Sequence, residues 1–132
     1  MALVRSEPDW LEVQLLLTIH DRQLAEHGGL SGVRDEGALE SAAMRPVNQW
    51  AYGEDDCCQL AASLAFGIAR NHPFSDGNKR TAWVAGRLFL AMNGCELTFA
   101  QEDAIAAVLA LAAGELGEDE FADWFRERLV TG

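Results

Sequence analysis

Apolar side chains recur every three or four residues along most of this chain, and the recurrence stops where glycine or proline stands. Between Trp10 and Leu24 the apolar residues keep this spacing, until the pair Gly28–Gly29 ends it, and such spacing places side chains on one face of an α-helix. No segment alternates apolar and polar residues convincingly, apart from a brief stretch from Cys95 to Phe99. The chain is therefore predicted to be all-α, a compact bundle of about six helices.

Local signals predict where these helices begin and end. Ser, Thr and Asp accept hydrogen bonds from the free amides at a helix start, whereas glycine and proline end helices. We expect the third and fifth helices, which are the most apolar, to lie inside the bundle. The predicted helices run from a capping box at Ser6 and Asp9 to Gly28, from Asp35 to Pro46, from Asp55 or Asp56 to Asn71, from about Gly77 to Asn93, from a capping box at Thr98 and Gln101 to Gly114, and from about Glu118 to Leu129.

Length and charge narrow the class of protein. The chain has 132 residues, which suits a single domain over residues 1–132. Ten basic against twenty-one acidic side chains leave a net charge of -11, and such a field repels nucleic acid and anionic lipid. The longest uncharged run, Cys57 to Ala69, is too short to cross a bilayer. Because the N-terminus holds no apolar signal segment, we expect a cytoplasmic protein that binds no membrane and no nucleic acid directly.

Residues that can take part in catalysis or ligand binding are concentrated between the third and fourth predicted helices. The run from Arg70 to Arg80 contains one histidine, His72, one carboxylate, Asp76, and the cations Lys79 and Arg80 at the helix start. Cations in a first helical turn are unfavourable by about 0.3–1 kcal/mol each, because that end carries a partial positive charge. A bound phosphate would remove this conflict. Taken singly, however, Asp76 could merely cap the helix and His72 could be a surface residue.

Next to a polyphosphate, this segment has the parts of a transfer site. Gly77 lacks a Cβ, which lets phosphate oxygens approach the backbone amides of Gly77, Asn78 and Lys79. Asp76 is a natural ligand for Mg²⁺, which usually takes one or two carboxylates together with phosphates and water. His72 can accept the proton of an attacking hydroxyl, because an unperturbed imidazole has a pKa near ~6.5. These residues suit phosphoryl or nucleotidyl transfer.

The run from His72 to Arg80 resembles the motif of the Fic family. It reads His-Pro-Phe-Ser-Asp-Gly-Asn-Lys-Arg, and the Fic motif is His-x-Phe-x-(Asp/Glu)-(Gly/Ala)-Asn-x-Arg. The segments 28–35, 39–42 and 78–82 are similar to those of the death-on-curing (Doc) branch, within a resemblance over roughly residues 10–95. This resemblance implies a Fic/Doc-like fold with the active-site loop between the third and fourth main helices.

The resemblance also implies a role for each residue of the site. His72 would be the general base, and Asp76 would hold Mg²⁺. Arg70 matches a basic residue of the Doc branch, although a cation at a helix C-terminus is also favourable by itself. The phosphates of ATP would be bound by Gly77, Asn78, Lys79 and Arg80, with Lys79 neutralising the transferred phosphate.

Two positions favour the Doc branch over the AMP-transferring branch. AMP-transferring members typically have glycine at the position of Lys79 and arginine at that of Trp83. Doc-type toxins of type II toxin–antitoxin systems transfer phosphate from ATP to a threonine of elongation factor Tu and so block translation, and the resemblance implies this activity here. Gly77 is instead commoner in AMP-transferring members, so AMP transfer to a protein hydroxyl stays open. A non-enzymatic helical module that binds a partner is a further alternative.

Self-restraining Fic enzymes carry an inhibitory Ser/Thr-x-x-x-Glu-Gly/Asn helix, of which this chain has no clean copy. Thr98 to Glu102 has the spacing, but Asp103 follows. The resemblance therefore implies inhibition by a small antitoxin of the Phd type, whose C-terminal segment would fold into a groove over the active site. Most large aromatics are expected in the core, although exposed ones could line this groove: they are Trp10, Trp50, Tyr52 and Trp124.

Other residues that often carry chemistry are expected to be structural. The three cysteines, Cys57, Cys58 and Cys95, are odd in number and two are adjacent, which suits neither a disulfide framework nor a metal site. We expect them to be reduced and mostly buried. His20 and His27 lie late in the first predicted helix and are expected to be structural or surface residues.

Overall fold

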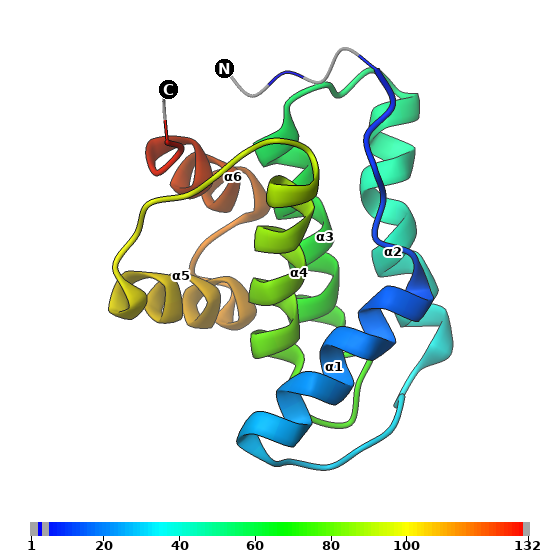
Figure 1. The fold of residues 1–132 in the computed structure, drawn as a ribbon. Coiled ribbons are helices and arrows are strands. Elements are labelled where there is room, and N and C mark those ends of the chain that lie inside the picture. Colours follow the sequence, from blue (N-terminus) through cyan, green and yellow to red (C-terminus); the bar gives the residue numbers. More distant parts are fainter. Residues whose placement is uncertain (1–2, 4–5, 131–132) are drawn as a thin grey trace.

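The computed structural model describes residues 3 and 6–130, and this part of the chain folds into six α-helices without a strand (Figure 1). The all-α prediction is confirmed, and the segment from His72 to Gly77 lies between the third and fourth helices as expected. None of the helices in the described residues is long and apolar enough to cross a membrane. The helices are α1 (Val13–His27), α2 (Glu36–Ala51), α3 (Cys57–Asn71), α4 (Asn78–Met92), α5 (Gln101–Ala113) and α6 (Glu118–Glu127).

Helix α3 runs through the middle of the bundle (Figure 1). From Cys57 to Ala69 all its residues are buried except Gln59 and Phe66, and it packs against α2, α4, α5 and α6. A helix with neighbours on nearly every side needs an apolar surface nearly all round. The prediction that the third helix lies inside the bundle is confirmed.

Helix α5 lies at the edge of the bundle, so the prediction that it lies inside is wrong. One face is buried through Ala104, Ala107 and Leu111, whereas Ile105 and Leu109 on the other face are 51% and 47% exposed. An apolar helix can be buried on every side, but how much of it is buried depends on how many other elements pack against it. The consequence is an apolar surface on the outside of α5.

Helix α1 begins later than the capping pattern indicated. Its N-cap is Glu12, in an extended conformation without a side-chain cap, so the predicted capping box at Ser6 and Asp9 is wrong. The Asp9 amide donates instead to Asn93 Oδ1 at 2.9 Å, and Asn93 Nδ2 donates to the Asp9 carbonyl at 3.1 Å. These bonds and the burial of Leu11 hold the segment extended against the end of α4, which a local pattern cannot register.

Helix α2 continues through Pro46 to Ala51, so the predicted stop at this proline is wrong. Proline has no N–H to donate to the carbonyl four residues earlier, and it usually interrupts a helix. Pro46 is buried here together with Leu39, Ala42 and Ala43, on a helix whose main neighbour is α3. Packing of this face outweighs the missing hydrogen bond.

The start of α5 differs from the predicted capping box at Thr98 and Gln101, which is wrong. The N-cap is Ala100, and no side chain caps the helix. The Thr98 amide donates to the carbonyl of Arg128 at 2.8 Å, across the chain from α6. This pairing with a distant segment keeps Thr98 outside the helix, and no local signal reports it.

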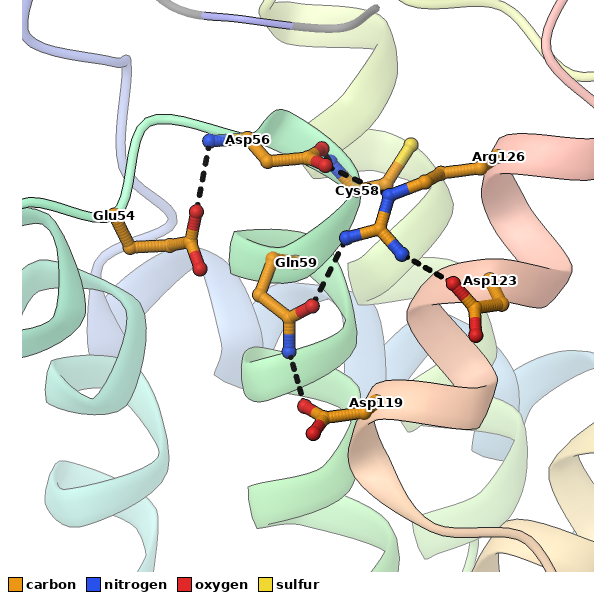
Figure 2. A network of polar contacts seen from close by, with 7 residues as sticks. All are labelled: Glu54, Asp56, Cys58, Gln59, Asp119, Asp123 and Arg126. Atoms are coloured by element: carbon orange, nitrogen blue, oxygen red, sulfur yellow. Dashed lines mark hydrogen bonds and ion pairs between the residues drawn. The ribbon is translucent and has the colours of Figure 1, made fainter.

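An ion-pair network fastens α6 to the start of α3 (Figure 2). Asp56 caps α3 by accepting from the Cys58 amide at 2.8 Å, and its second oxygen accepts from Arg126 Nε at 2.7 Å. Arg126 also donates to Gln59 Oε1 at 3.0 Å and to Asp123 Oδ1 at 2.5 Å. One guanidinium therefore links the cap of α3 to the last turn of α6.

Candidate active site

The loop that joins α3 to α4 begins with an unusual backbone conformation at His72. With φ 49° and ψ 60°, His72 is the one non-glycine residue of positive φ in the described part of the chain. Such a conformation costs about 1–3 kcal/mol and persists only where the surroundings enforce it. Helix α3 ends at Asn71 as predicted. A residue before proline is usually extended, whereas His72 is left-handed.

The segment after α1 holds this conformation in place. Arg34 Nε donates to the His72 carbonyl at 2.8 Å, and Arg34 Nη2 donates to the Asn71 carbonyl at 2.9 Å. The Arg34 amide donates to the Pro73 carbonyl at 2.8 Å, and the Ser75 amide donates to the carbonyl of Gly32 at 3.0 Å. The loop after α1 therefore pairs with the loop after α3, a contact between distant segments that the sequence pattern did not reveal.

Phe74 and Asn78 close the loop on itself. Phe74 is fully buried and anchors the loop in the core. Asn78 Oδ1 accepts from the Phe74 amide at 3.0 Å, and Asn78 Nδ2 donates to the Phe74 carbonyl at 3.0 Å. The side chain of Asn78 thus holds both polar backbone groups of Phe74, while its own backbone amide remains available to a ligand.

Asp76 is exposed, and backbone amides hold both of its carboxylate oxygens. The Leu30 amide donates to Oδ2 at 3.2 Å, and the Gly77 amide donates to Oδ1 at 2.9 Å. These hydrogen bonds, the one from Leu30 first, lower the pKa of Asp76 below its usual range, so the carboxylate is ionised. Gly29 has φ 123°, which L side chains rarely adopt, and a Cβ there would lie 2.8 Å from Oδ2, so this position favours glycine.

Asp76 does not cap α4, which removes the simpler explanation of this residue. The N-cap is Gly77, in the left-handed region at φ 75°, and no side chain caps the helix. Within the part of the chain that the structure describes, no group accepts a hydrogen bond from the amides of Asn78, Lys79 or Arg80, whereas the Thr81 amide donates to the Gly77 carbonyl. Three amides at the positive end of the helix are therefore open to an anion.

His72 and Lys79 line the same hollow, which has a volume of about 620 Å³. The rest of its lining comes from the exposed face of α5, including Leu109, and from Glu115 just after this helix. A larger hollow of about 700 Å³ lies between the end of α2 and the start of α6 and contains none of the predicted site residues. The first hollow is the better candidate because an imidazole and an ammonium face it beside open amides.

Comparison with known proteins agrees with this geometry. The model of the Fic/DOC family matches residues 10–90. This chain belongs to the Fic/Doc family. The matched residues include both loops that build the site, the one after α1 and the one after α3.

Two curated relatives belong to the Doc branch of the family. The chain is 37% identical over 112 residues to "Protein kinase doc" of Escherichia phage P1, covering 84% of this chain and 88% of that protein. It is 48% identical over 73 residues to "Toxin Doc" of Mycolicibacterium smegmatis (strain ATCC 700084 / mc(2)155), covering 53% of this chain and 55% of that protein. The predicted family is confirmed.

Arg70 does not line the hollow that contains His72 and Lys79. Its guanidinium lies over the ring of Phe66, 5.1 Å from the centroid. A Cβ on Gly114 would lie 3.7 Å from the guanidinium carbon, and Gly114 is the C-cap of α5. Arg70 therefore stands beside the negative end of α5.

Magnesium and a nucleotide fit the residues that are present. The described residues contain no cluster of three or more His, Cys, Asp or Glu side chains that could hold a metal ion by themselves. Mg²⁺ typically needs only one or two protein carboxylates when phosphates and water supply the remaining ligands. The exposed, ionised Asp76 beside the open amides of α4 matches that requirement.

His20 is a further residue that contacts the catalytic loop without a local sequence signal for it. His20, expected to be structural or at the surface, is 2% exposed and reaches the loop from α1. Its Nε2 lies 2.8 Å from the Asp76 carbonyl oxygen. No sequence signal distinguishes it from His27, which is exposed at the end of the same helix.

The large aromatics divide between core and surface. Trp10, Trp50 and Trp124 are partly buried and pack against the core, as expected, whereas Tyr52 is 93% exposed. Tyr52 lines the larger hollow at the end of α2 and not the hollow beside His72. It therefore does not contribute to a groove over the candidate active site.

Proposed function

We propose that this chain is a Doc-like toxin that transfers the γ-phosphate of ATP to a serine or threonine hydroxyl of a target protein. The observation that carries the proposal is the shared hollow of His72 and Lys79 beside the three open amides at the start of α4. An imidazole facing a phosphate site can accept the proton of the attacking hydroxyl. Phosphoryl transfer otherwise depends on positioning and charge neutralisation.

Local charge supports a triphosphate as the ligand. Residues 70–87 contain four cations, Arg70, Lys79, Arg80 and Arg87, and one carboxylate, Asp76, in a chain of net charge -11. The open amides and the dipole of α4 add to this positive field. Apart from this patch, the field of the chain repels polyanions.

Each side chain has a distinct task in the proposed reaction. His72 accepts the hydroxyl proton, and Asp76 is the ionised ligand for magnesium, which neutralises charge on the phosphates when it is bound. Lys79 faces the transferred phosphate from the hollow, while Arg80 and Arg70 bind phosphates at the periphery. The amides of Asn78, Lys79 and Arg80 bind phosphate oxygens. The Gly77 amide does not, because it donates to Asp76 Oδ1.

Three observations favour phosphate transfer over AMP transfer. Lys79 lines the same hollow as His72, and the relative whose match covers 84% of this chain is named a protein kinase. Trp83, where AMP-transferring members have an arginine, packs against Phe99 with ring centroids 5.0 Å apart. AMP transfer remains the second candidate because Gly77 is the residue more common in that branch.

A Phd-type antitoxin is the proposed inhibitor, and elongation factor Tu the proposed target in the cytoplasm. The exposed apolar face of α5, with Ile105 and Leu109, borders the hollow that contains His72. A folded segment with an apolar face, laid along α5, would cover Ile105 and Leu109 and close the hollow. The names "Protein kinase doc" and "Toxin Doc" of the relatives support a toxin with such a partner.

Labelled ATP tests the proposal directly. The protein is incubated with magnesium, purified elongation factor Tu and either γ-labelled or α-labelled ATP, with Asp76→Asn as the control. Transfer of the γ label alone is the expected result. Transfer of the α label would establish AMP transfer instead, and absence of both labels with intact growth inhibition by His72→Ala would favour a non-enzymatic module.

A further inference from the structure

A histidine outside the catalytic loop donates to its backbone. His20 of α1 is 2% exposed, and its Nε2 lies 2.8 Å from the carbonyl oxygen of Asp76, 56 residues away in the sequence. A carbonyl oxygen only accepts hydrogen bonds, so Nε2 must carry the proton. This contact ties the backbone of the loop to the interior of the bundle.

The loop in turn holds the imidazole in place. The ring of His20 stacks on Phe74 with centroids 3.8 Å apart and 6° between the planes. A Cβ on Gly77 would lie 3.7 Å from both Cδ2 and Nε2 of His20, so the ring also lies against the backbone of Gly77. Contacts on both Phe74 and Gly77 leave the imidazole little freedom to turn away from the Asp76 carbonyl.

The direction of this carbonyl decides the direction of the next amide. In a trans peptide the C=O and the following N–H point in opposite directions, and no cis peptide occurs in the described residues. Because the Asp76 carbonyl points inward to His20, the Gly77 N–H points outward, where it donates to Asp76 Oδ1 at 2.9 Å. The Leu30 amide completes the arrangement by donating to Oδ2 at 3.2 Å.

We propose that His20 is a positioning residue for the transfer site. By donating to the Asp76 carbonyl, it holds the Asp76–Gly77 peptide in the orientation that presents the carboxylate and the open amides of α4 on the same side of the loop. His20 itself touches neither the hydroxyl nor the phosphates. The proposal rests on the proposed function only for the identity of the ligand, a magnesium–nucleotide.

Two substitutions separate the hydrogen bond from the packing of the ring. His20→Phe keeps an aromatic ring on Phe74 but removes the donor, whereas His20→Gln keeps an amide donor near the position of Nε2 and removes the ring. Ile19→Val, a mild truncation of the buried neighbour in α1, is the control for a general loss of stability. The readouts are the amide resonances of Leu30 and Gly77 in the free protein, the affinity for magnesium–ADP by calorimetry, and γ-label transfer.

His20→Phe is expected to move both amide resonances and to weaken magnesium–ADP binding and transfer by about 10- to 100-fold, as loss of an outer partner of a metal ligand does. His20→Gln is expected to lie closer to the native protein in each readout, and Ile19→Val to match it. Unchanged resonances and affinity in His20→Phe, or equal losses in His20→Gln, would show that His20 acts only in packing. A native protein that transfers no γ label would refute the proposed function, while the resonances would still decide the role of His20.

Discussion

Arg34 Nε donates to the carbonyl oxygen of His72 at 2.8 Å, across 38 residues of sequence. Its Nη2 donates to the Asn71 carbonyl at 2.9 Å, so one guanidinium binds the two carbonyls at which α3 turns into the catalytic loop. A cation at this end of a helix is favoured by the helix dipole. The left-handed conformation of His72 is thus held by a residue of the loop after α1.

Arg34→Met is expected to reduce phosphate transfer more than stability. The side chain is exposed, so the free energy of unfolding should fall by only about 1 kcal/mol, whereas misplacement of His72 can lower the rate by up to about 100-fold. Urea unfolding and γ-label transfer measure the two effects. Arg22→Met, an exposed arginine of α1, is the matched control, and equal rates in the two variants would contradict the role of Arg34.

Asn78→Ala removes both hydrogen bonds between the Asn78 side chain and the Phe74 backbone. We expect the free energy of unfolding to fall by about 1–3 kcal/mol, because two backbone groups lose their partner beside a buried ring. Transfer should also fall, since the loop is no longer closed. Chemical unfolding is the measurement, with the exposed Asn48→Ala of α2 as the control. A loss no larger than that of Asn48→Ala would count against this closure.

His72→Ala and Asp76→Ala are each expected to abolish transfer and growth inhibition while leaving a folded protein. Both side chains are exposed, so their removal costs little packing. Circular dichroism and thermal unfolding establish the fold, and growth of an expressing strain reports toxicity. His27→Ala changes another exposed histidine and should remain toxic. Toxicity that survives either site substitution would exclude the proposed mechanism.

Arg126→Met should destabilise the protein by about 1–3 kcal/mol, because Asp56 and Gln59 lose a charged donor at a partly buried contact. Asp123 also pairs with this guanidinium, but its own side chain is 63% exposed. Asp123→Ala should therefore lower the free energy of unfolding by at most about 1 kcal/mol. Urea unfolding compares the two variants. Equal losses would mean that the contact between α6 and the α3 cap adds nothing beyond a surface ion pair.

Stability is expected to fall in alkali because of two buried thiols. Burial raises the pKa of Cys57 and raises that of Cys58 to about 12, so both thiols stay protonated in the folded protein. In the unfolded chain they release their protons around pH 9.0, so the unfolded state binds fewer protons above that pH and stability falls as the pH rises.

The expected loss is about 1 kcal/mol for each thiol at about pH 10. Urea unfolding at about pH 8 and about pH 10 measures it, and the Cys57→Ala/Cys58→Ala variant should lose less between the two conditions. A native protein and a double variant with the same alkaline loss would show that other groups are responsible.

Helices α3 and α5 show most clearly where local sequence pattern and tertiary packing differ. Helix α3 was predicted to lie inside because its apolar residues cover nearly the whole surface of the helix, and no other placement buries them. Helix α5 is comparably apolar, yet Ile105 and Leu109 remain exposed, because burial there depends on how many elements surround it. Likewise, Thr98 and Gln101 have the spacing of a capping box, but the Thr98 amide donates to the carbonyl of Arg128 instead.

By itself the sequence determined that the chain forms helices, that α3 is central and that the loop from His72 to Gly77 joins α3 to α4, because apolar periodicity and glycine leave signals within a few residues. Only the tertiary structure decided how that loop is held. Arg34 and His20 reach it from segments 38 and 56 residues away, and hydrogen bonds at such separations depend on how helices pack rather than on any local pattern of residues.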